Sequence, residues 1–512
     1  MKRAGRLTFL LLLFAALFGA YVRLFAVARA GFPLLDGGLF YAMTGDLLAN
    51  NFRLPLVTSY NHLNIPFAYP PLPLYLAGFI HVLTRVDLLE IFRWLPVTFS
   101  LLTLPAFFLL AREMLESPAQ AALATFIFAL LPRSYDWIVM GGGVTRAPAA
   151  LFLILFLWAC YRAFCRKSWG ASAWAAVFGG LVLLSHPERA LHAAAAGLLF
   201  WLWLEHSRSG ALRALAIGGG VLLVSTPWWV TGLLRYGGET LLLAAQAVGP
   251  RWLFWAPLLQ LDFTDESAPL VALLAMLGAF AGWKRGKDLL AVWFVLAFLV
   301  DPRSAPHVIA IQVALLAAIG LTDVLFPALE RFSAGWLEAL EKTPGRVFFG
   351  YVLVVMLFNA QWNLLQIGNY VLTKADRQAI EWAAAETPPG SRFLVLDWQE
   401  TPMLSPLLEW FPALSGRMNV VTIQGREWLS GAAHFTARME TYPDLYACHY
   451  EVADCLTTWA AQNGETFDYV YLSLLTPNGE RRLSRLSDSL RASAEYQLFY
   501  ETPELLIFER LP

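Results

Sequence analysis

Charged residues are scarce in this chain. They fill 15% of its 512 positions, whereas 58% are hydrophobic and the mean hydropathy is +0.54. Soluble domains carry about 25% charged residues, so the composition excludes an ordinary soluble globule. The net charge is −1 and no run of Lys and Arg occurs, which argues against nucleic acid as a partner. The composition predicts a protein embedded among membrane lipids.

Eleven apolar segments are long enough to cross a membrane. The first starts at Leu7, after Lys2, Arg3 and Arg6, and no small-residue cleavage site follows it, so we interpret it as a retained span. The other ten cover residues 94–111, 119–140, 145–164, 169–185, 190–205, 212–234, 268–283, 289–300, 305–326 and 347–365.

The stretch 70–83 decides the topology. It is short and opens with Tyr69-Pro70-Pro71-Leu72-Pro73, and prolines remove backbone donors that lipid does not replace. If it lies in the membrane plane, all five lysines before residue 370 share the cytoplasmic side. If it crosses, every later loop changes side and four of the five face outward. We favour the in-plane arrangement, which puts the N-terminus in the cytoplasm and the tail outside the plasma membrane.

The polar tail has the pattern of a small α/β domain. Residues 392–397, 467–474 and 496–509 are rich in β-branched and aromatic side chains and predict strands. Residues 376–386 predict a helix capped by Asp376 and ended by Thr387-Pro388-Pro389-Gly390. The predicted fold is therefore an α-helical polytopic membrane domain, 1–370, with a first outer loop at 29–93, followed by an extracytoplasmic α/β domain, 371–512.

Only four cysteines are present. Cys160 and Cys165 end an apolar segment, whereas Cys448 and Cys455 lie in the tail. An extracytoplasmic tail meets oxidising conditions, so we expect a local disulfide between Cys448 and Cys455, with two unpaired thiols as the alternative. Metal binding there is disfavoured, since His449 is the one nearby partner of ligand type.

Polar residues gather near the segment ends that this topology places outside. Asp36 precedes Gly37-Gly38, which permit close approach of a ligand, and it is a candidate general base or a helix N-cap. The run Gly141-Gly142-Gly143-Val144-Thr145-Arg146 enters an apolar segment and offers amides, a hydroxyl and a guanidinium to a phosphate, or simply forms a turn. Arg303 is a second phosphate candidate, with an interaction with Asp301 or a snorkelling side chain as alternatives.

Five further side chains are expected to line a substrate cavity that opens outward. His186 and Glu188 flank Pro187 between two segments, although an interfacial turn explains them equally well, and two such residues make a poor metal site. The expected lining residues are Tyr41, Tyr69, Asp136, His186 and Glu188.

The order of parts resembles the GT-C glycosyltransferases. The first outer loop carries the resemblance, through Asp36-Gly37-Gly38-Leu39-Phe40-Tyr41 and Ala68-Tyr69-Pro70-Pro71-Leu72-Pro73-Leu74-Tyr75. The nearer branches are the bacterial protein mannosyltransferase-like and aminoarabinose transferase-like enzymes. Many members carry two adjacent acidic residues where this chain has Asp36 and Gly37, and a second carboxylate near the Tyr69 position, where this chain has none.

The resemblance implies a hexosyl or pentosyl transferase that takes a sugar from a polyprenyl phosphate and passes it to an acceptor on the outer face. The acidic residue of the first loop, here Asp36, would act as general base or metal ligand, and a divalent metal ion is the one cofactor left open. Arg303, Arg146, Thr145, Gly142 and Gly143 would bind the donor phosphate. The acceptor could be a protein, a lipid or a glycan. The alternatives are a transporter or flippase of a lipid-linked glycan and a non-catalytic receptor or assembly protein.

Overall fold

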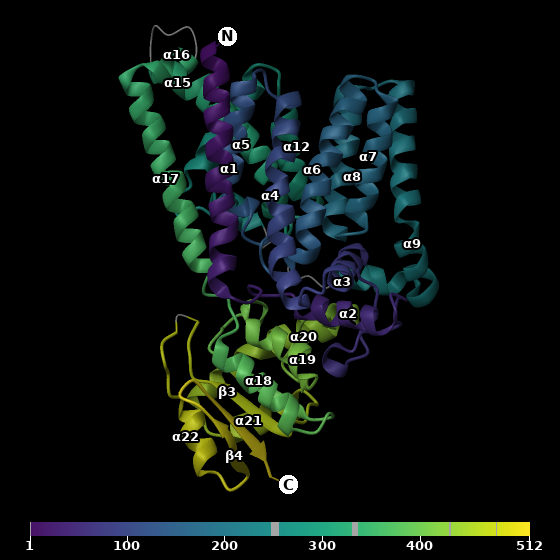
Figure 1. The fold of residues 1–512 in the computed structure, drawn as a ribbon, viewed down its shortest axis with the longest axis vertical. Helices are drawn as coiled ribbons and strands as arrows, with labels where there is room; N and C mark the ends of the chain where they lie inside the picture. The colour runs from purple at the N-terminus through teal and green to yellow at the C-terminus, as the bar shows by residue number, and fades with distance from the viewer. Residues whose placement is uncertain (1, 247–254, 330–335, 430–431, 478, 512) are drawn as a thin grey trace.

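A computed structural model describes residues 2–246, 255–329, 336–429, 432–477 and 479–511. Its membrane part is a bundle of helices, and its C-terminal part is a small domain built on one sheet (Figure 1). The N-terminus lies at one end of the bundle, and the C-terminal domain covers the opposite end.

Each of the eleven predicted segments overlaps helix in the structure. The helices of the membrane part are α1 (Lys2–Ala30), α2 (Gly38–Ala49), α3 (Leu72–Thr84), α4 (Leu88–Met114), α5 (Pro118–Leu130), α6 (Gly143–Cys165), α7 (Trp169–Leu183), α8 (Pro187–Leu204), α9 (Arg208–Gln246), α10 (Ala256–Leu259), α11 (Leu270–Lys284), α12 (Leu289–Val300), α13 (Ala305–Val308), α14 (Ala310–Ile319), α15 (Phe326–Leu329), α16 (Trp336–Glu341) and α17 (Thr343–Ile367).

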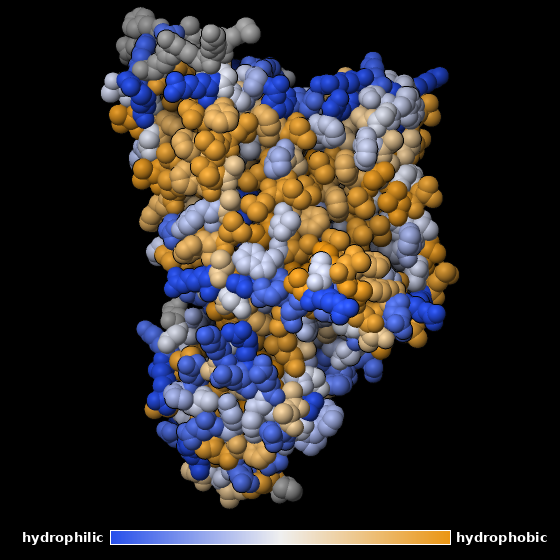
Figure 2. Space-filling model, in the orientation of Figure 1, coloured by the Kyte–Doolittle hydropathy of each residue, from blue (hydrophilic) through white to orange (hydrophobic). Residues whose placement is uncertain are grey.

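Six helices in the described part of the chain are long and apolar enough to cross a membrane by length and composition. They begin at Ala4, Leu88, Gly143, Arg208, Ala310 and Thr343. Figure 2 shows a broad hydrophobic band across the face of the bundle in view, bounded by hydrophilic side chains at both ends. The fold is therefore that of a polytopic membrane protein.

The prediction of one span over 119–140 is wrong in its second half. Helix α5 ends at Leu130, because Pro132 follows and opens a short 3₁₀ turn, η2 (Pro132–Ser134). The buried Arg23 of α1 holds this end of α5, donating to the Ala129 carbonyl at 2.9 Å and to Ser134 Oγ at 3.1 Å. The chain from there to Gly142 forms a polar turn that carries Asp136.

The first outer loop runs between α1 and α4 and contains two helices. Figure 1 places α2 and α3 at the end of the bundle that faces the C-terminal domain. Helix α3 covers most of the stretch 70–83, starts with proline at its first turn and packs against α2, α4 and α6. This position favours the in-plane arrangement expected for the stretch.

The C-terminal domain has a five-stranded sheet in the order β2-β1-β3-β5-β4. Its strands are β1 (Arg392–Leu396), β2 (Met418–Asn419), β3 (Tyr469–Ser473), β4 (Tyr496–Glu501) and β5 (Leu505–Arg510). Strand β1 pairs in parallel with β2 and β3, while β5 pairs antiparallel with β3 and β4. Its helices are α18 (Lys374–Glu386), α19 (Pro406–Ser415), α20 (Ala432–Ala447), α21 (Asp454–Gln462) and α22 (Arg485–Ala492).

Two local predictions for this domain need correction. The single strand predicted over 496–509 is a hairpin, because Thr502-Pro503 forms a turn between β4 and β5. Helix α18 is capped by Thr373, whereas Asp376 is the third residue of the reciprocal capping box. The structure also joins Cys448 and Cys455 in a disulfide.

Two hydrophobic cores lie on either side of the linker after α17. One fills the helix bundle, and the other packs the sheet against its helices. The polar residues of interest lie where these two parts meet, at the end of the bundle covered by α19 and α20 (Figure 1).

Candidate active site

Asp36 and Arg146 form an ion pair at the start of α6. Arg146 donates from Nη1 to Asp36 Oδ2 at 2.7 Å and from Nη2 to Oδ1 at 2.9 Å. The Gly142 amide adds a third hydrogen bond to Oδ1 at 2.9 Å. Two candidates that sequence reasoning named separately thus form a single unit, and Asp36 is not the N-cap of α2, a place held by Gly37.

The glycine run is required by close packing around this pair. A Cβ at Gly142 would lie 2.4 Å from Asp36 Oδ2, and one at Gly141 would lie 2.0 Å from the Asp36 carbonyl oxygen. The amides of Gly141, Gly142 and Gly143 donate to Leu34, Asp36 and Met140, respectively. The phosphate-binding role expected for Gly142 and Gly143 therefore stays a prediction, without a free amide to support it.

Tyr69 lies beside the ion pair and connects it to other candidates. Its hydroxyl donates to Thr145 Oγ1 at 3.3 Å. Its ring centroid lies 6.3 Å from that of His186 in an edge-to-face contact. Four of the predicted site residues thus lie close together, although they come from the first loop, α6 and the start of α8. They are Tyr69, Thr145, Arg146 and His186.

Arg303 pairs with Glu188, not with the side chain of Asp301. The Arg303 guanidinium contacts the Glu188 carboxylate, while Asp301 accepts from the Arg303 backbone amide at 3.2 Å. Ser304, the next residue, donates to Asp301 and contacts His192 Nε2 at 2.8 Å. This network ties the start of α8 to the loop after α12 and orients Arg303.

Arg189, in the first turn of α8, is a residue that sequence reasoning passed over. Only 5% of its surface is exposed, and within the described residues its guanidinium has no hydrogen bond or ion pair. A buried charge without a partner costs several kcal/mol, on the order estimated for an uncompensated ion. The run His186-Pro187-Glu188-Arg189 was visible in the sequence, but its burial was not.

An apolar cavity of about 540 Å³ lies between α6, α7, α8 and α9, and Arg189 is not among the residues that line it. Pro187 and Leu191, on either side of Arg189 in the chain, both line it. Its walls are almost wholly hydrophobic and include Phe156, Phe164, Leu183 and Gly218. A volume of this size is typical of ligand pockets, about 300–1,000 Å³.

The C-terminal domain contributes Glu409 to the site, a residue that no sequence pattern indicated. Glu409 lies on α19, and its Oε1 accepts the Gly37 amide at 2.8 Å, next to Asp36. Burial, aided by the negative charge of Asp36, raises the pKa of Glu409 to about 8. The C-terminal domain therefore holds the loop that carries Asp36 through the carboxyl group of Glu409, which favours its neutral form.

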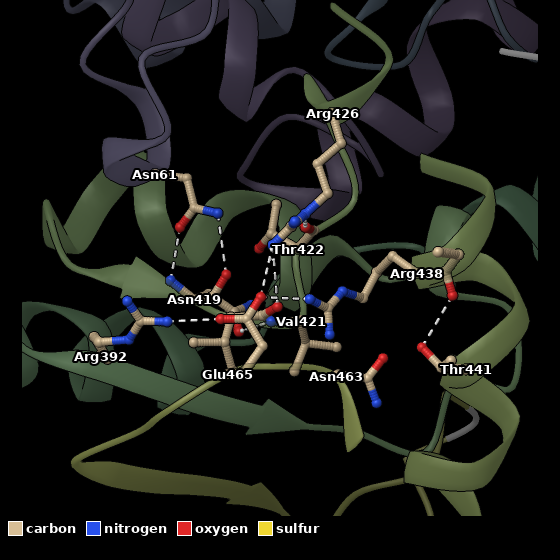
Figure 3. Close-up of polar contacts among 12 residues, drawn as sticks. Asn61, Arg392, Asn419, Val421, Thr422, Arg426, Arg438, Thr441, Asn463 and Glu465 are labelled. Atoms are coloured by element: carbon tan, nitrogen blue, oxygen red, sulfur yellow. Dashed lines mark hydrogen bonds and ion pairs between the residues drawn. The ribbon is translucent and has the colours of Figure 1, made fainter. Parts of the chain in front are cut away.

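The 3₁₀ turn η6 (Arg426–Trp428) is a second part of the C-terminal domain that reaches the site. The Trp428 ring lies 6.1 Å from that of Tyr69, and burial raises the pKa of Glu427 while the nearby Arg303 opposes the shift. Figure 3 shows how the turn is anchored, with Arg426, Arg438 and Arg392 around Glu465.

The same domain also fixes the first loop. The Asn61 side chain accepts from the Asn419 amide at 2.7 Å and donates to the Asn419 carbonyl at 3.0 Å (Figure 3). The C-terminal domain therefore acts on the site from two directions, through η6 and through the first loop.

Two expected cavity residues lie elsewhere. The Tyr41 ring packs against Phe92 and Trp410, each at 5.8 Å between centroids. Asp136 lies beside Arg133 and lines a separate cavity of about 400 Å³. The two residues are thus not part of the cluster around Arg146, although Trp137, next to Asp136, accepts from Arg146 Nε at 2.9 Å through its carbonyl.

The residues around Asp36 do not fit a metal ion. No group of three or more His, Cys, Asp or Glu side chains suited to a metal occurs within the described parts of the chain. The carboxylate of Asp36 is already bound by a cation, the Arg146 guanidinium.

Comparison with known proteins finds similarity in fold. No protein-family model and no curated protein sequence matches the chain. ArnT from Cupriavidus metallidurans in the apo state matches with a TM-score of 0.58 and 14% identity over 99% of this chain and 98% of that one. The Archaeoglobus fulgidus oligosaccharyltransferase matches with a TM-score of 0.55 and 14% identity, over 91% of this chain and 69% of that one.

Arabinofuranosyltransferase AftD from Mycobacteria matches with a TM-score of 0.52 and 16% identity, covering 98% of this chain but 40% of its own. These neighbours are GT-C glycosyltransferases. The resemblance predicted from the first loop is confirmed at the level of the fold.

Proposed function

We propose that this protein is a glycosyltransferase that moves a sugar from a polyprenyl phosphate to an acceptor on the outer face of the membrane. Its fold supports this, and one of its fold neighbours, ArnT from Cupriavidus metallidurans, has been solved bound to undecaprenyl phosphate, with a TM-score of 0.56 and 14% identity. A shared fold alone does not determine function, whereas the residues of a site do.

The observation that carries the proposal is the combination of the buried Arg189 and the apolar cavity, which involve different faces of α8. A long hydrocarbon tail suits walls formed by four helices, and an anionic head group suits a buried guanidinium that has no ion-pair partner among the residues the structure describes. Both features occur within one turn of α8. A lipid with an apolar tail and a phosphate head matches this pairing of surfaces.

Arg189 and Arg303 are proposed to hold the donor phosphate. Arg303 is oriented by Glu188, and Glu188 lies next to Arg189 in the chain. When the bond between the anomeric carbon and the phosphate oxygen breaks, the electron pair stays on that oxygen. The two guanidinium groups would stabilise the resulting charge, and stabilisation of developing charge is commonly the largest contribution to catalysis.

Asp36 is proposed to accept the proton of the acceptor hydroxyl as that oxygen bonds to the anomeric carbon. A carboxylate offers about four acceptor positions. Arg146 and the Gly142 amide occupy three of them, two on Oδ1 and one on Oδ2. One position on Oδ2 remains for a hydroxyl, while the ion pair fixes the orientation of the base.

The direction of the chain in the membrane is part of this proposal. The N-terminus and the C-terminal domain lie at opposite ends of the bundle (Figure 1). With the N-terminal Lys2, Arg3 and Arg6 in the cytoplasm, the domain and the site beneath it face the outside of the cell membrane. The acceptor would then reach Asp36 from the extracytoplasmic side.

Asp36→Asn is the direct test. The purified full-length protein would be incubated with radiolabelled polyprenyl-phosphate sugars and membrane extract, and transfer of label measured. Loss of a general base typically lowers the rate about 10²–10⁴-fold, and we expect this for Asp36→Asn without a change in melting temperature beyond a few degrees. Asp288→Asn, at the N-terminus of α12 outside the site, is the matched control and should transfer at the wild-type rate.

Transfer by Asp36→Asn at a near wild-type rate would remove Asp36 as the base. Movement of the lipid-linked sugar across a vesicle membrane without transfer would instead indicate a flippase. If the wild-type protein uses no donor in the panel, the result would favour a non-catalytic receptor or assembly protein.

A further inference from the structure

Asp36 lies between two residues with unusual backbone conformations. Leu35 has a φ of 51° and Gly37 has a φ of 121°. Both values are in the left-handed region, which a bulky residue such as leucine rarely adopts. At Gly37 a side chain would not fit, because a Cβ would lie 2.8 Å from the carbonyl carbon of Gly141. A strained backbone persists only where the surrounding structure holds it, and such strain is concentrated at functional sites.

Helix α19 of the C-terminal domain holds the backbone on both sides of Asp36. Before it, the Leu35 carbonyl accepts from the Trp410 indole Nε1 at 3.0 Å. After it, the Gly37 amide donates to Glu409 Oε1 at 2.8 Å. Figure 1 shows α19 next to α2, the helix that begins at the end of this loop, and the two helices pack together. Two adjacent residues of one helix therefore hold both neighbours of Asp36.

The two side chains of α19 are themselves firmly placed. Trp410 is fully buried, and its ring centroid lies 4.9 Å from that of Phe32 and 5.8 Å from that of Tyr41, which precede and follow the loop. Glu409 is 4% exposed, and its carbonyl accepts from the Tyr60 hydroxyl at 2.8 Å. Helix α19 therefore presents a fixed surface that can hold the loop in a strained conformation.

The helix bundle fixes a different part of the same residue. Arg146 and the Gly142 amide bind the Asp36 carboxylate. The bundle thus orients the side chain, whereas the C-terminal domain fixes the backbone to which that side chain is attached. A general base must lie within hydrogen-bond reach of the proton that it accepts, so the position of the backbone matters as much as the orientation of the carboxylate.

We propose that α19 is the positioning element of this loop, and that Glu409 and Trp410 are positioning residues for Asp36. They act through hydrogen bonds to the loop backbone and take no part in the chemistry. The hold on the loop rests on these contacts, whereas its importance for sugar transfer rests on the proposed function. Transfer would then require the C-terminal domain, although Asp36 and the arginines of the site belong to the membrane part.

A direct chemical role for Glu409 fits the site less well. Burial, aided by the charge of Asp36, raises the pKa of Glu409 to about 8, so its neutral form predominates near pH 7. A protonated carboxyl group does not accept the proton of a hydroxyl, but its carbonyl oxygen still accepts from an amide. Glutamine has the same shape and the same acceptor oxygen, so Glu409→Gln separates positioning from chemistry.

The hold on the loop would be measured by hydrogen–deuterium exchange of residues 33–41 in the purified full-length protein. Glu409→Ala and Trp410→Phe each remove one hydrogen bond to this backbone, so its exchange should become about fivefold faster. Trp459→Phe is the matched control, because Trp459 is 2% exposed in the same domain and its indole donates to the Thr441 carbonyl at 2.9 Å. It should leave the exchange of the loop unchanged.

The consequence for transfer would be measured with the radiolabelled donors. Misplacement of the base in Glu409→Ala should lower kcat about 10–100-fold, while KM for the donor should change by less than about twofold, because the donor phosphate is bound elsewhere. Glu409→Gln should keep kcat within about threefold of the wild-type value. Added to Asp36→Asn, Glu409→Ala should lower the rate no further, because it acts through Asp36.

Unchanged exchange of the loop in both Glu409→Ala and Trp410→Phe would overturn the inference, and so would faster exchange with a wild-type kcat. A Glu409→Gln protein as slow as Glu409→Ala would also overturn it, since that result gives the carboxyl group a chemical role. The proposed function fails separately. If the wild-type protein transfers no sugar, or if Asp36→Asn transfers at the wild-type rate, the exchange measurement still decides whether α19 holds the loop.

Discussion

The two ends of helix α8 hold arginines of similar burial in opposite situations. At the end away from the C-terminal domain, Arg213 of α9 is 3% exposed and pairs with Glu205, which follows α8. Its Nε donates to Glu205 Oε2 at 3.1 Å, and its guanidinium lies 5.5 Å from the centre of the Trp169 ring. At the other end, Arg189 is 5% exposed and has no such partner among the described residues.

This difference separates an arginine that stabilises the fold from one that suits a ligand. Removing one member of a buried pair leaves the other charged and uncompensated. Removing a buried charge that has no partner relieves a cost instead. At Arg213 and Glu205, the basic and the acidic side chain are both folded inward at the loop between α8 and α9.

The largest effect is expected from Arg213→Ala. It leaves Glu205 buried without a counter-charge, so the free energy of unfolding should fall by about 3–5 kcal/mol, measured by thermal or denaturant unfolding in detergent. Arg208→Ala, an exposed position five residues earlier, should change it by less than about 0.5 kcal/mol. An Arg213→Ala protein as stable as the wild type would show that the pair is not structural.

Arg189→Ala should have the opposite profile. Loss of one charge-assisted contact to phosphate costs about 1.5–3 kcal/mol, so kcat/KM for the polyprenyl donor should fall about 10–100-fold. Unfolding should occur at or above the wild-type temperature, because a buried charge has been removed. Destabilisation like that of Arg213→Ala, with normal use of the donor, would erase the contrast between the two ends of α8.

The smallest effect concerns the apolar cavity between α6, α7, α8 and α9. Gly218 lines it, and a Cβ there meets no atom within 4 Å, so Gly218→Leu should fill space without moving the backbone. Displacing part of a lipid tail costs about 1 kcal/mol, and KM for long-chain donors should rise about fivefold. Gly219→Leu is the matched control, since Gly219 also has open space around its Cβ position but lies outside the cavity wall. Equal effects of both substitutions on KM would argue against a tail in this cavity.

Sequence reasoning found one half of the candidate site and missed the other. Asp36 and Arg146 attract attention because an acidic residue beside glycines and an arginine at the start of an apolar helix are unusual in a membrane protein. Glu409 carries no such signal. It occupies the first turn of a helix capped by Ser405, where acidic residues are common for reasons of helix stability alone.

The helices and strands show the same contrast between features that the sequence predicts and features that it does not. Long apolar stretches predicted helices at all eleven positions, because hydrophobic length is a property of the chain itself. The end of α5 and the hairpin of β4 and β5 were missed, since both depend on a single proline within a run that otherwise continues the pattern.

The amino-acid sequence by itself determined that this protein lies in a membrane, where its helices run and that a small α/β domain follows them. Hydrophobicity and turn residues act locally, so they can be identified without knowing what lies nearby. Only the tertiary structure decided that Arg146 meets Asp36 across 110 positions and that Glu409 reaches the same loop. It also left Arg189 buried without a hydrogen-bond or ion-pair partner in the described part of the chain. Pairing of charges depends on contacts between distant segments, and those contacts arise only when the domain and the bundle pack together.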